Sequence, residues 1–227
     1  MTTLLLGDRA PDFRAESQDG PLHLYGWQGG SWVVLFSHPR DFTPVCSTEV
    51  AEIARLSPEF TRRDVKVATL STGTPAGHAV WAEQLTEAFG TPVRFPLISD
   101  PSLTVARLYG MLHPSSSDVT TIRSVFVIDP QHRVRLTLSY PPTTGRNFAE
   151  ILRVVDSLQI ADRQNVVTPA NWMPGSPVLV PHDIGDDEAE QRWGEVDRTL
   201  PYVRKVSVAG RSALAPESAR PVRLLSD

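Results

Sequence analysis

Cysteine is the residue that this chain of 227 amino acids has least of, because only Cys46 is present. A single cysteine cannot close a disulfide within the chain, and it excludes cysteine-based zinc clusters and Cys-x-x-Cys redox pairs. Any disulfide must therefore join the chain to a second molecule. Metal-ligand spacing is also absent among the histidines His23, His78, His113, His132 and His182. We therefore expect no metal and no other cofactor.

An excess of basic charge and long apolar runs are absent from the sequence as well. The formal net charge is −4, and no basic cluster of the kind that nucleic-acid binding needs is present. Residues 1–8 hold no positive region and only three consecutive leucines, which is too short a run for a signal peptide or a membrane span. We expect a cytoplasmic protein that neither binds nucleic acid nor inserts into membranes.

Enough apolar sequence remains for a packed core, since hydrophobic residues make up 41% of the chain and charged residues 21%. The run 31–36 is typical of a buried strand, and helical apolar spacing follows it from Val50 to Leu56. A second strand is predicted at 65–71. This strand–helix–strand order implies a parallel pair of strands with a right-handed crossover.

The same signals alternate along the rest of the first 165 residues. Together they predict an α/β sandwich with a hairpin at one side. The expected elements are a short strand at 22–25, a helix that starts at Thr74-Pro75 with His78, Trp81 and Leu85 on one face, a short strand at 95–98, a helix at 101–109, a strand at 123–128, a hairpin strand at 134–140, and a helix opened by a capping box of Asn147 and Glu150.

Prolines spread through the sequence beyond residue 165, where the only helix candidate is 186–193. Such a stretch buries little by itself, so we expect it to pack on the core or on a second subunit. The last stretch is rich in Ala, Ser, Pro and Arg, which is typical of a disordered tail. The predicted organisation is a core domain over 1–165, a C-terminal arm over 166–208 and a flexible tail over 209–227.

Cys46 lies where a thiolate is favoured. Thr43 followed by Pro44 is a helix-start signal, because threonine can cap free backbone N–H groups and proline fits the first helical position. Cys46 is then the third helical residue, among unsatisfied N–H groups at the positive end of the helix dipole. That environment favours the thiolate. A small buried apolar residue is the alternative interpretation of a lone cysteine.

At these residues the chain resembles a known family. Pro39, Thr43 and Cys46 stand in the Pro-x-x-x-Thr-x-x-Cys arrangement of the peroxiredoxins, the alkyl hydroperoxide reductase/thiol-specific antioxidant superfamily. The segment 38–46 is similar to their one-cysteine, peroxiredoxin-6 type, and further matches fall at 6–13, 140–148, 150–155 and 168–172. The resemblance implies a thioredoxin-like sandwich with a C-terminal extension that takes part in dimer contacts.

The resemblance also implies roles for residues around Cys46. Thr43 would orient the substrate and Arg123 would stabilise the thiolate and donate to a peroxide, while Pro39 would shape and shield the loop. A second arginine, Arg146, would support Arg123 by ion pairing together with Glu49. His38 would be an accessory near the sulfur. From the residues alone, the alternatives are a helix cap for Thr43, a turn proline for Pro39 and a solvated strand end for Arg123.

The implied activity is a thiol-dependent peroxidase. The Cys46 thiolate would attack hydrogen peroxide or an alkyl hydroperoxide and become a sulfenic acid. Because the chain holds no second cysteine, an external thiol must reduce that acid, and excess peroxide should drive Cys46 to sulfinic and sulfonic acids. We expect a homodimer, with higher oligomers possible.

Three other functions compete with this interpretation. A redox-responsive sensor or holdase would use Cys46 as a switch that reacts once. A cysteine-dependent hydrolase would need a Cys46–His38 dyad, but the sequence shows no partner that orients the imidazole. Some relatives are described as phospholipases, and the serine region is present at Ser31. The positions of their histidine and aspartate hold Tyr25 and Gln131, so we expect no such activity.

Overall fold

The computed structural model describes residues 4–112 and 120–208, so the predicted tail and His113 lie outside the described residues. The chain divides into two compact units, and the boundary falls between Phe148 and Ala149. The predicted boundary at 165 lies later. Ile160 in the last long helix packs with Val166 and Trp172 in the core of the second unit, so the packing changes before the proline-rich composition begins.

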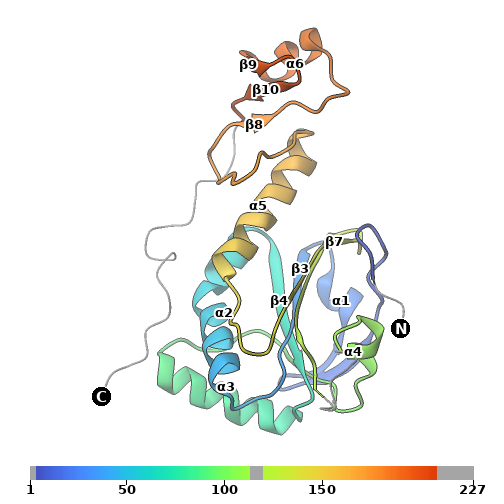
Figure 1. Cartoon of the computed structure of the whole chain (residues 1–227). Coiled ribbons are helices and arrows are strands. Elements are labelled where there is room, and N and C mark those ends of the chain that lie inside the picture. Colours follow the sequence, from blue (N-terminus) through green and yellow to red (C-terminus); the bar gives the residue numbers. More distant parts are fainter. Residues whose placement is uncertain (1–3, 113–119, 209–227) are drawn as a thin grey trace. The chain divides into compact units, whose positions relative to one another are not determined.

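The first unit is built on a mixed sheet with the strand order β2-β1-β5-β4-β3-β6-β7 (Figure 1). The central strands β3, β4 and β5 run parallel, and the strands beside them pair antiparallel. The predicted parallel pair is confirmed as β3 and β4. The strands are β1 (Arg14–Ser17), β2 (Gly20–His23), β3 (Trp32–Ser37), β4 (Val65–Ser71), β5 (Leu97–Ser99), β6 (Arg123–Ile128) and β7 (Val134–Tyr140).

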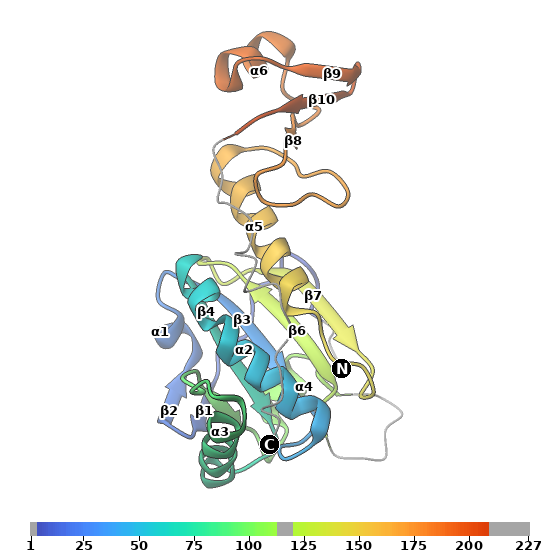
Figure 2. The same ribbon diagram turned by 90° about the vertical axis from the view of Figure 1, so that its left-hand side faces the viewer.

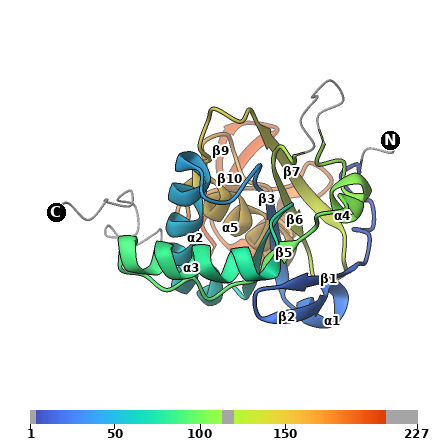
Figure 3. The same cartoon turned by 90° about the horizontal axis from the view of Figure 1, so that it is seen from below.

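Helices cover both faces of this sheet. In Figures 1 and 3, α2 (Pro44–Arg62) and α3 (Pro75–Phe89) lie along one face, while α1 (Leu24–Gln28) and α4 (Thr104–Leu108) lie on the other. Figure 2 shows α2 crossing in front of β3 and β4. Alternate residues of β3 point to opposite faces of the sheet and pack against different helices. Leu35 packs in the cluster that includes Ala106 of α4, while the Phe36 ring lies 5.3 Å from that of Phe148.

Two local predictions were wrong. Residues 22–25 do not form one strand, because β2 ends at His23 and α1 begins at Leu24. Alternation over four residues is too short to separate a strand from the start of an amphipathic turn, and both Leu24 and Gln28 are buried one turn apart. The helix predicted at 101–109 begins only at Thr104, whose N–H donates to the carboxylate of Asp100 at 2.8 Å.

The second unit contains most of α5 (Phe148–Gln164) and a small sheet with the strand order β8-β10-β9. Its core includes Trp172 and Val178, together with Ala189 of the predicted helix 186–193, which is confirmed. The strands were not predicted, because each is only two to four residues long. The remaining elements are β8 (Val178–Leu179), α6 (Asp186–Trp193), β9 (Asp197–Leu200) and β10 (Val203–Val206).

Candidate active site

Cys46 is fully buried in the first turn of α2, with an exposed fraction of 0%. Pro44 is the first helical residue, as predicted, and Thr43 precedes the helix in an extended conformation. The Thr43 hydroxyl does not cap the helix. It donates to the carbonyl of Arg40 at 2.9 Å, while the Thr43 carbonyl accepts from the N–H of Ser47. The first-turn N–H groups around Cys46 are therefore left without a side-chain cap.

Arg123 brings a positive charge to the sulfur from the neighbouring strand. The β3–β6 pairing places Val125 opposite Phe36, so the start of β6 lies beside the end of β3 that leads into α2. The Arg123 guanidinium is buried, and its Nη1 lies 3.4 Å from Cys46 Sγ and 2.7 Å from Glu49 Oε2. The carbonyl of Pro142 accepts from its other nitrogens at 2.9 and 3.1 Å. The guanidinium is thus fixed on all sides at the thiol.

Glu49 joins Arg123 to Arg146, as the resemblance implied. Arg146 donates from Nη2 to Glu49 Oε2 at 2.7 Å and from Nε to Oε1 at 2.9 Å. Its Nη1 donates to the backbone carbonyls of Ser37 and Ser124. Burial by itself would raise the pKa of Glu49, but the hydrogen bonds and charge of Arg146, with the charge of Arg123, lower it below its ordinary value. Glu49 is therefore an anion that holds two cations in place.

His38 has an orienting partner that sequence reasoning missed. Its Nε2 lies 2.8 Å from Asp41 Oδ1 and its Nδ1 2.7 Å from Thr69 Oγ1, so both ring nitrogens are occupied by groups other than the sulfur. Burial lowers the pKa of His38 despite the nearby carboxylate, so the ring is neutral at neutral pH. Nε2 then donates to Asp41 and Nδ1 accepts from Thr69. A Cys46–His38 dyad of the hydrolase type is not formed.

Residues 38–43, which we call the cysteine loop, connect β3 to α2. Pro39 is half-buried in this loop, and Phe42 is 54% exposed with its backbone at φ 55°. Asp41 is buried beside His38, and His78 of α3 lies on the other side of its carboxylate. Figure 1 shows the start of α2 beside α3 at the same edge of the sheet. No sequence signal connected His78 to this loop, because the contact depends on how α3 packs.

Ser31, the serine of the phospholipase alternative, bonds a carboxylate and not an imidazole. Its hydroxyl donates to Asp64 Oδ1 at 2.7 Å, while Tyr25 stacks on the ring of His132. Among residues 4–112 and 120–208, no group of three or more His, Cys, Asp or Glu side chains could hold a metal ion.

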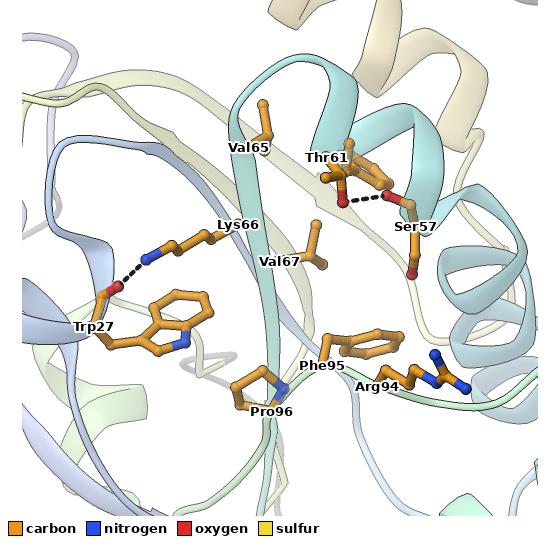
Figure 4. Close-up of a pocket in the computed structure, with 10 residues that line it drawn as sticks. Trp27, Ser57, Thr61, Val65, Lys66, Val67, Arg94, Phe95 and Pro96 are labelled. Carbon is orange, nitrogen blue, oxygen red and sulfur yellow. Dashed lines mark hydrogen bonds between the residues drawn. The ribbon is translucent and has the colours of Figure 1, made fainter.

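A cavity of about 250 Å³ lies at the opposite end of α2 (Figure 4). Its walls include Trp27, Phe95 and the last turns of α2. Three of the polar groups here are already bonded: Lys66 Nζ donates to the Trp27 carbonyl, and the hydroxyls of Ser57 and Thr61 donate to helix carbonyls. None of the residues that line this cavity is a thiol or part of an acid–base pair.

Comparison with known families agrees with the geometry at Cys46. The chain matches the AhpC/TSA family over residues 6–137 and the C-terminal domain of 1-Cys peroxiredoxin over residues 157–195. The chain belongs to the peroxiredoxins. The resemblance of the 38–46 segment is thereby confirmed.

Individual peroxiredoxins match most of the chain. Mouse peroxiredoxin-6 is 43% identical over 212 residues, which cover 89% of this chain and 95% of that protein. A peroxiredoxin of Aquifex aeolicus is 46% identical over 200 residues, covering 84% and 90%. A solved structure of yeast mitochondrial 1-Cys peroxiredoxin, which concerns thiol resolution via glutathione and thioredoxin systems, superposes with a TM-score of 0.86 at 42% identity and covers 91% of this chain and 100% of its own.

Membership of this family makes the chain a thiol-dependent peroxidase, as predicted, and its fold is the thioredoxin-like α/β fold with a C-terminal extension. Within the described parts of the chain, no helix of this peroxiredoxin is long and apolar enough to cross a membrane.

Proposed function

We propose that Cys46 is the peroxide-reducing residue and that hydrogen peroxide and alkyl hydroperoxides are its substrates. The observation that carries this proposal is the 3.4 Å contact between Arg123 Nη1 and Cys46 Sγ in the first turn of α2. A guanidinium and a helix N-terminus both stabilise a thiolate. The thiolate attacks the distal peroxide oxygen, the O–O bond breaks, and the leaving alkoxide or hydroxide takes up a proton. The products are a sulfenic acid and an alcohol or water.

The residues around the sulfur stabilise this step in different ways. Arg123 can donate to the peroxide as negative charge moves to the leaving oxygen, and Glu49 with Arg146 holds the guanidinium in place. Thr43 orients the peroxide through its hydroxyl, while Pro39 limits the access of water. Positioning matters most here, because a more ionised thiolate is also a weaker nucleophile.

The sulfenic acid is resolved by an external thiol. Its attack forms a mixed disulfide and water, and a second thiol then releases the Cys46 thiol and a low-molecular-weight or protein disulfide. The related yeast structure concerns glutathione and thioredoxin systems, which supports a reductant of that class here. No metal or prosthetic group takes part in these steps, so chelators should leave the activity unchanged.

Peroxide consumption by wild type and Cys46→Ser tests the proposal, with excess dithiothreitol and either hydrogen peroxide or cumene hydroperoxide. We expect many turnovers for wild type and none for the variant. If wild type stops after one equivalent while its oligomer size changes, the chain is instead a redox-responsive sensor or holdase. Absence of any reaction would make Cys46 a structural thiol.

A homodimer and a cytoplasmic location are also proposed. The second unit exposes large apolar side chains, with exposed fractions of 47% for Met173, 45% for Leu200 and 75% for Tyr202, which supports its use as a subunit contact. Light scattering of the purified protein tests the dimer, and cell fractionation tests the location, since one yeast relative is mitochondrial.

A further inference from the structure

The side chain of Asp41 is one anchor of the cysteine loop, beside that of His38, whose Nδ1 lies 2.7 Å from Thr69 Oγ1. Oδ1 of Asp41 accepts from His38 Nε2 and from Ser71 Oγ, each at 2.8 Å, and its Oδ2 lies 3.2 Å from His78 Nε2. These partners come from the loop itself, from the end of β4 and from α3. All of them are buried, and His78 and Ser71 have exposed fractions of 0%. The loop is thus bonded through one carboxylate to two elements of the rigid core.

The ring of His78 is oriented so that one nitrogen faces this carboxylate. Its Nδ1 lies 2.9 Å from the carbonyl of Leu97, which can only accept, so Nδ1 carries a hydrogen. Nε2 is thereby left to face the carboxylate of Asp41, and it also lies 3.0 Å from Ser71 Oγ. Burial would raise the pKa of Asp41, but the hydrogen bonds from His38 and His78 hold it well below its ordinary range.

Gly73 leaves room for the pair. A Cβ at this position would lie 2.2 Å from Asp41 Oδ2 and 2.6 Å from His78 Nε2. No larger residue fits without separating the two side chains. The loop backbone beside Asp41 is strained as well, because Phe42 is a bulky residue at φ 55°, in the left-handed region. Such conformations persist only where the surroundings hold them.

We propose that the Asp41–His78 pair is a positioning couple that holds the cysteine loop closed over Cys46. The couple keeps Pro39 and Thr43, which flank Asp41 and Phe42, at the sulfur during the peroxide step. Cys46 is fully buried in this arrangement, so the thiol that reduces the sulfenic acid reaches it only when the contact is released. A weaker couple should therefore slow oxidation of Cys46 and speed its reduction. This inference rests on the proposed role of Cys46.

Two substitutions at His78 distinguish its contact with Asp41 from its bond to Leu97. In His78→Gln the amide nitrogen takes the place of Nε2 and can still donate to Asp41. In His78→Asn it takes the place of Nδ1, so the bond to Leu97 stays and the bond to Asp41 is lost. His132→Asn serves as the control, because His132 bonds Gln28 and stacks on Tyr25 away from the loop.

The rates are measured separately by stopped-flow fluorescence: oxidation by hydrogen peroxide without thiol, then reduction of the oxidised enzyme by dithiothreitol. For His78→Asn we expect oxidation about tenfold slower, as for a small misplacement of catalytic groups, and reduction several times faster. His78→Gln should recover most of the wild-type values for both rates, and His132→Asn should match wild type. Equal behaviour of the two His78 variants, or a parallel fall of both rates, would overturn the proposal.

Alkylation of Cys46 by iodoacetamide keeps the test independent of the peroxidase function. If the loop is released, His78→Asn is alkylated faster than His78→Gln, even in an enzyme that does not turn over peroxide. If wild type fails to consume peroxide but this difference is present, the proposed function is wrong and the positioning couple is correct. Identical alkylation rates would reject the couple.

Discussion

The two ends of α2 differ in a way that shows where the chemistry lies. The C-terminal end borders an open cavity of about 250 Å³, where Ser57, Thr61 and Lys66 donate to backbone carbonyls. The N-terminal end concentrates buried groups: the thiol of Cys46, the charged network of Glu49 and Arg123, and the Asp41–His78 pair. Hollow space alone is therefore a poor guide to the site of this peroxiredoxin, whereas concentrated buried charge is a good one.

The largest expected effect follows from removing the cation at the sulfur. Arg123→Met should lower kcat/KM for hydrogen peroxide by about 100-fold or more, because one fixed donor to the developing charge is lost. Steady-state kinetics with saturating thiol measure it. Arg135→Met is the matched control, since Arg135 lies on the neighbouring strand β7 and pairs with Asp129. A loss of less than about threefold would show that Arg123 is only structural.

Glu49→Gln should mainly reduce stability. The change leaves two buried guanidinium groups without their anion, which costs about 3 kcal/mol in the free energy of unfolding. Urea denaturation followed by tryptophan fluorescence measures it. Glu52→Gln on the same helix is the control. Glu52 pairs with Arg55 at a more exposed position, so its loss should cost less than about 1 kcal/mol.

The difference between wild type and Glu49→Gln should also depend on pH. The pKa of Glu49 is lower in the folded chain than in the unfolded one, so its contribution is fully present above the ordinary glutamate pKa. That contribution is lost as the pH falls through the folded value. The two unfolding free energies should therefore converge in acid, and a difference that grows there would contradict the assignment of Glu49 as a buried anion.

The sequence predicted the residues of the site that lie at or near the sulfur. Cys46 at the third helical position follows from local signals, and the matched motifs nominated Arg123, Glu49 and Arg146. The hydroxyl of Thr43 was misassigned as a cap, because the sequence does not show that the carbonyl of Arg40 lies within its reach. Short strands and the first turn of α4 were missed or misplaced for a similar reason, since tertiary contacts decide such brief elements.

Asp41 and His78 could not be paired from the sequence. They lie on different elements, and their contact exists only after β4 has placed Ser71 and Gly73 between them. The histidine was set aside because nothing near it in the chain resembles a ligand set. Only the packing of α3 against the cysteine loop brings it to Asp41.

A smaller effect is expected at Gly73, which tests that packing without altering either partner. In Gly73→Ala the added methyl group would lie 2.2 Å from Asp41 Oδ2 and 2.6 Å from His78 Nε2, closer than van der Waals contact allows. The pair must therefore separate. Oxidation of Cys46 should slow by up to about tenfold. Gly30→Ala is the control, because nothing lies within 4 Å of its Cβ position. Unchanged oxidation with full stability would show that the loop does not need the pair.

The smallest effect is expected at the cavity end of α2. Lys66→Met removes the donor to the Trp27 carbonyl and a cation 5.6 Å from the Trp27 ring, both at a partly exposed position. The loss of stability should stay near 1 kcal/mol, since the freed carbonyl can bond water. Peroxide kinetics should not change, because the contacts of Lys66 are to Trp27, at the opposite end of α2 from Cys46. A clear fall in kcat/KM for Lys66→Met would mean that the two ends of α2 are coupled, and the contrast between them would then fail.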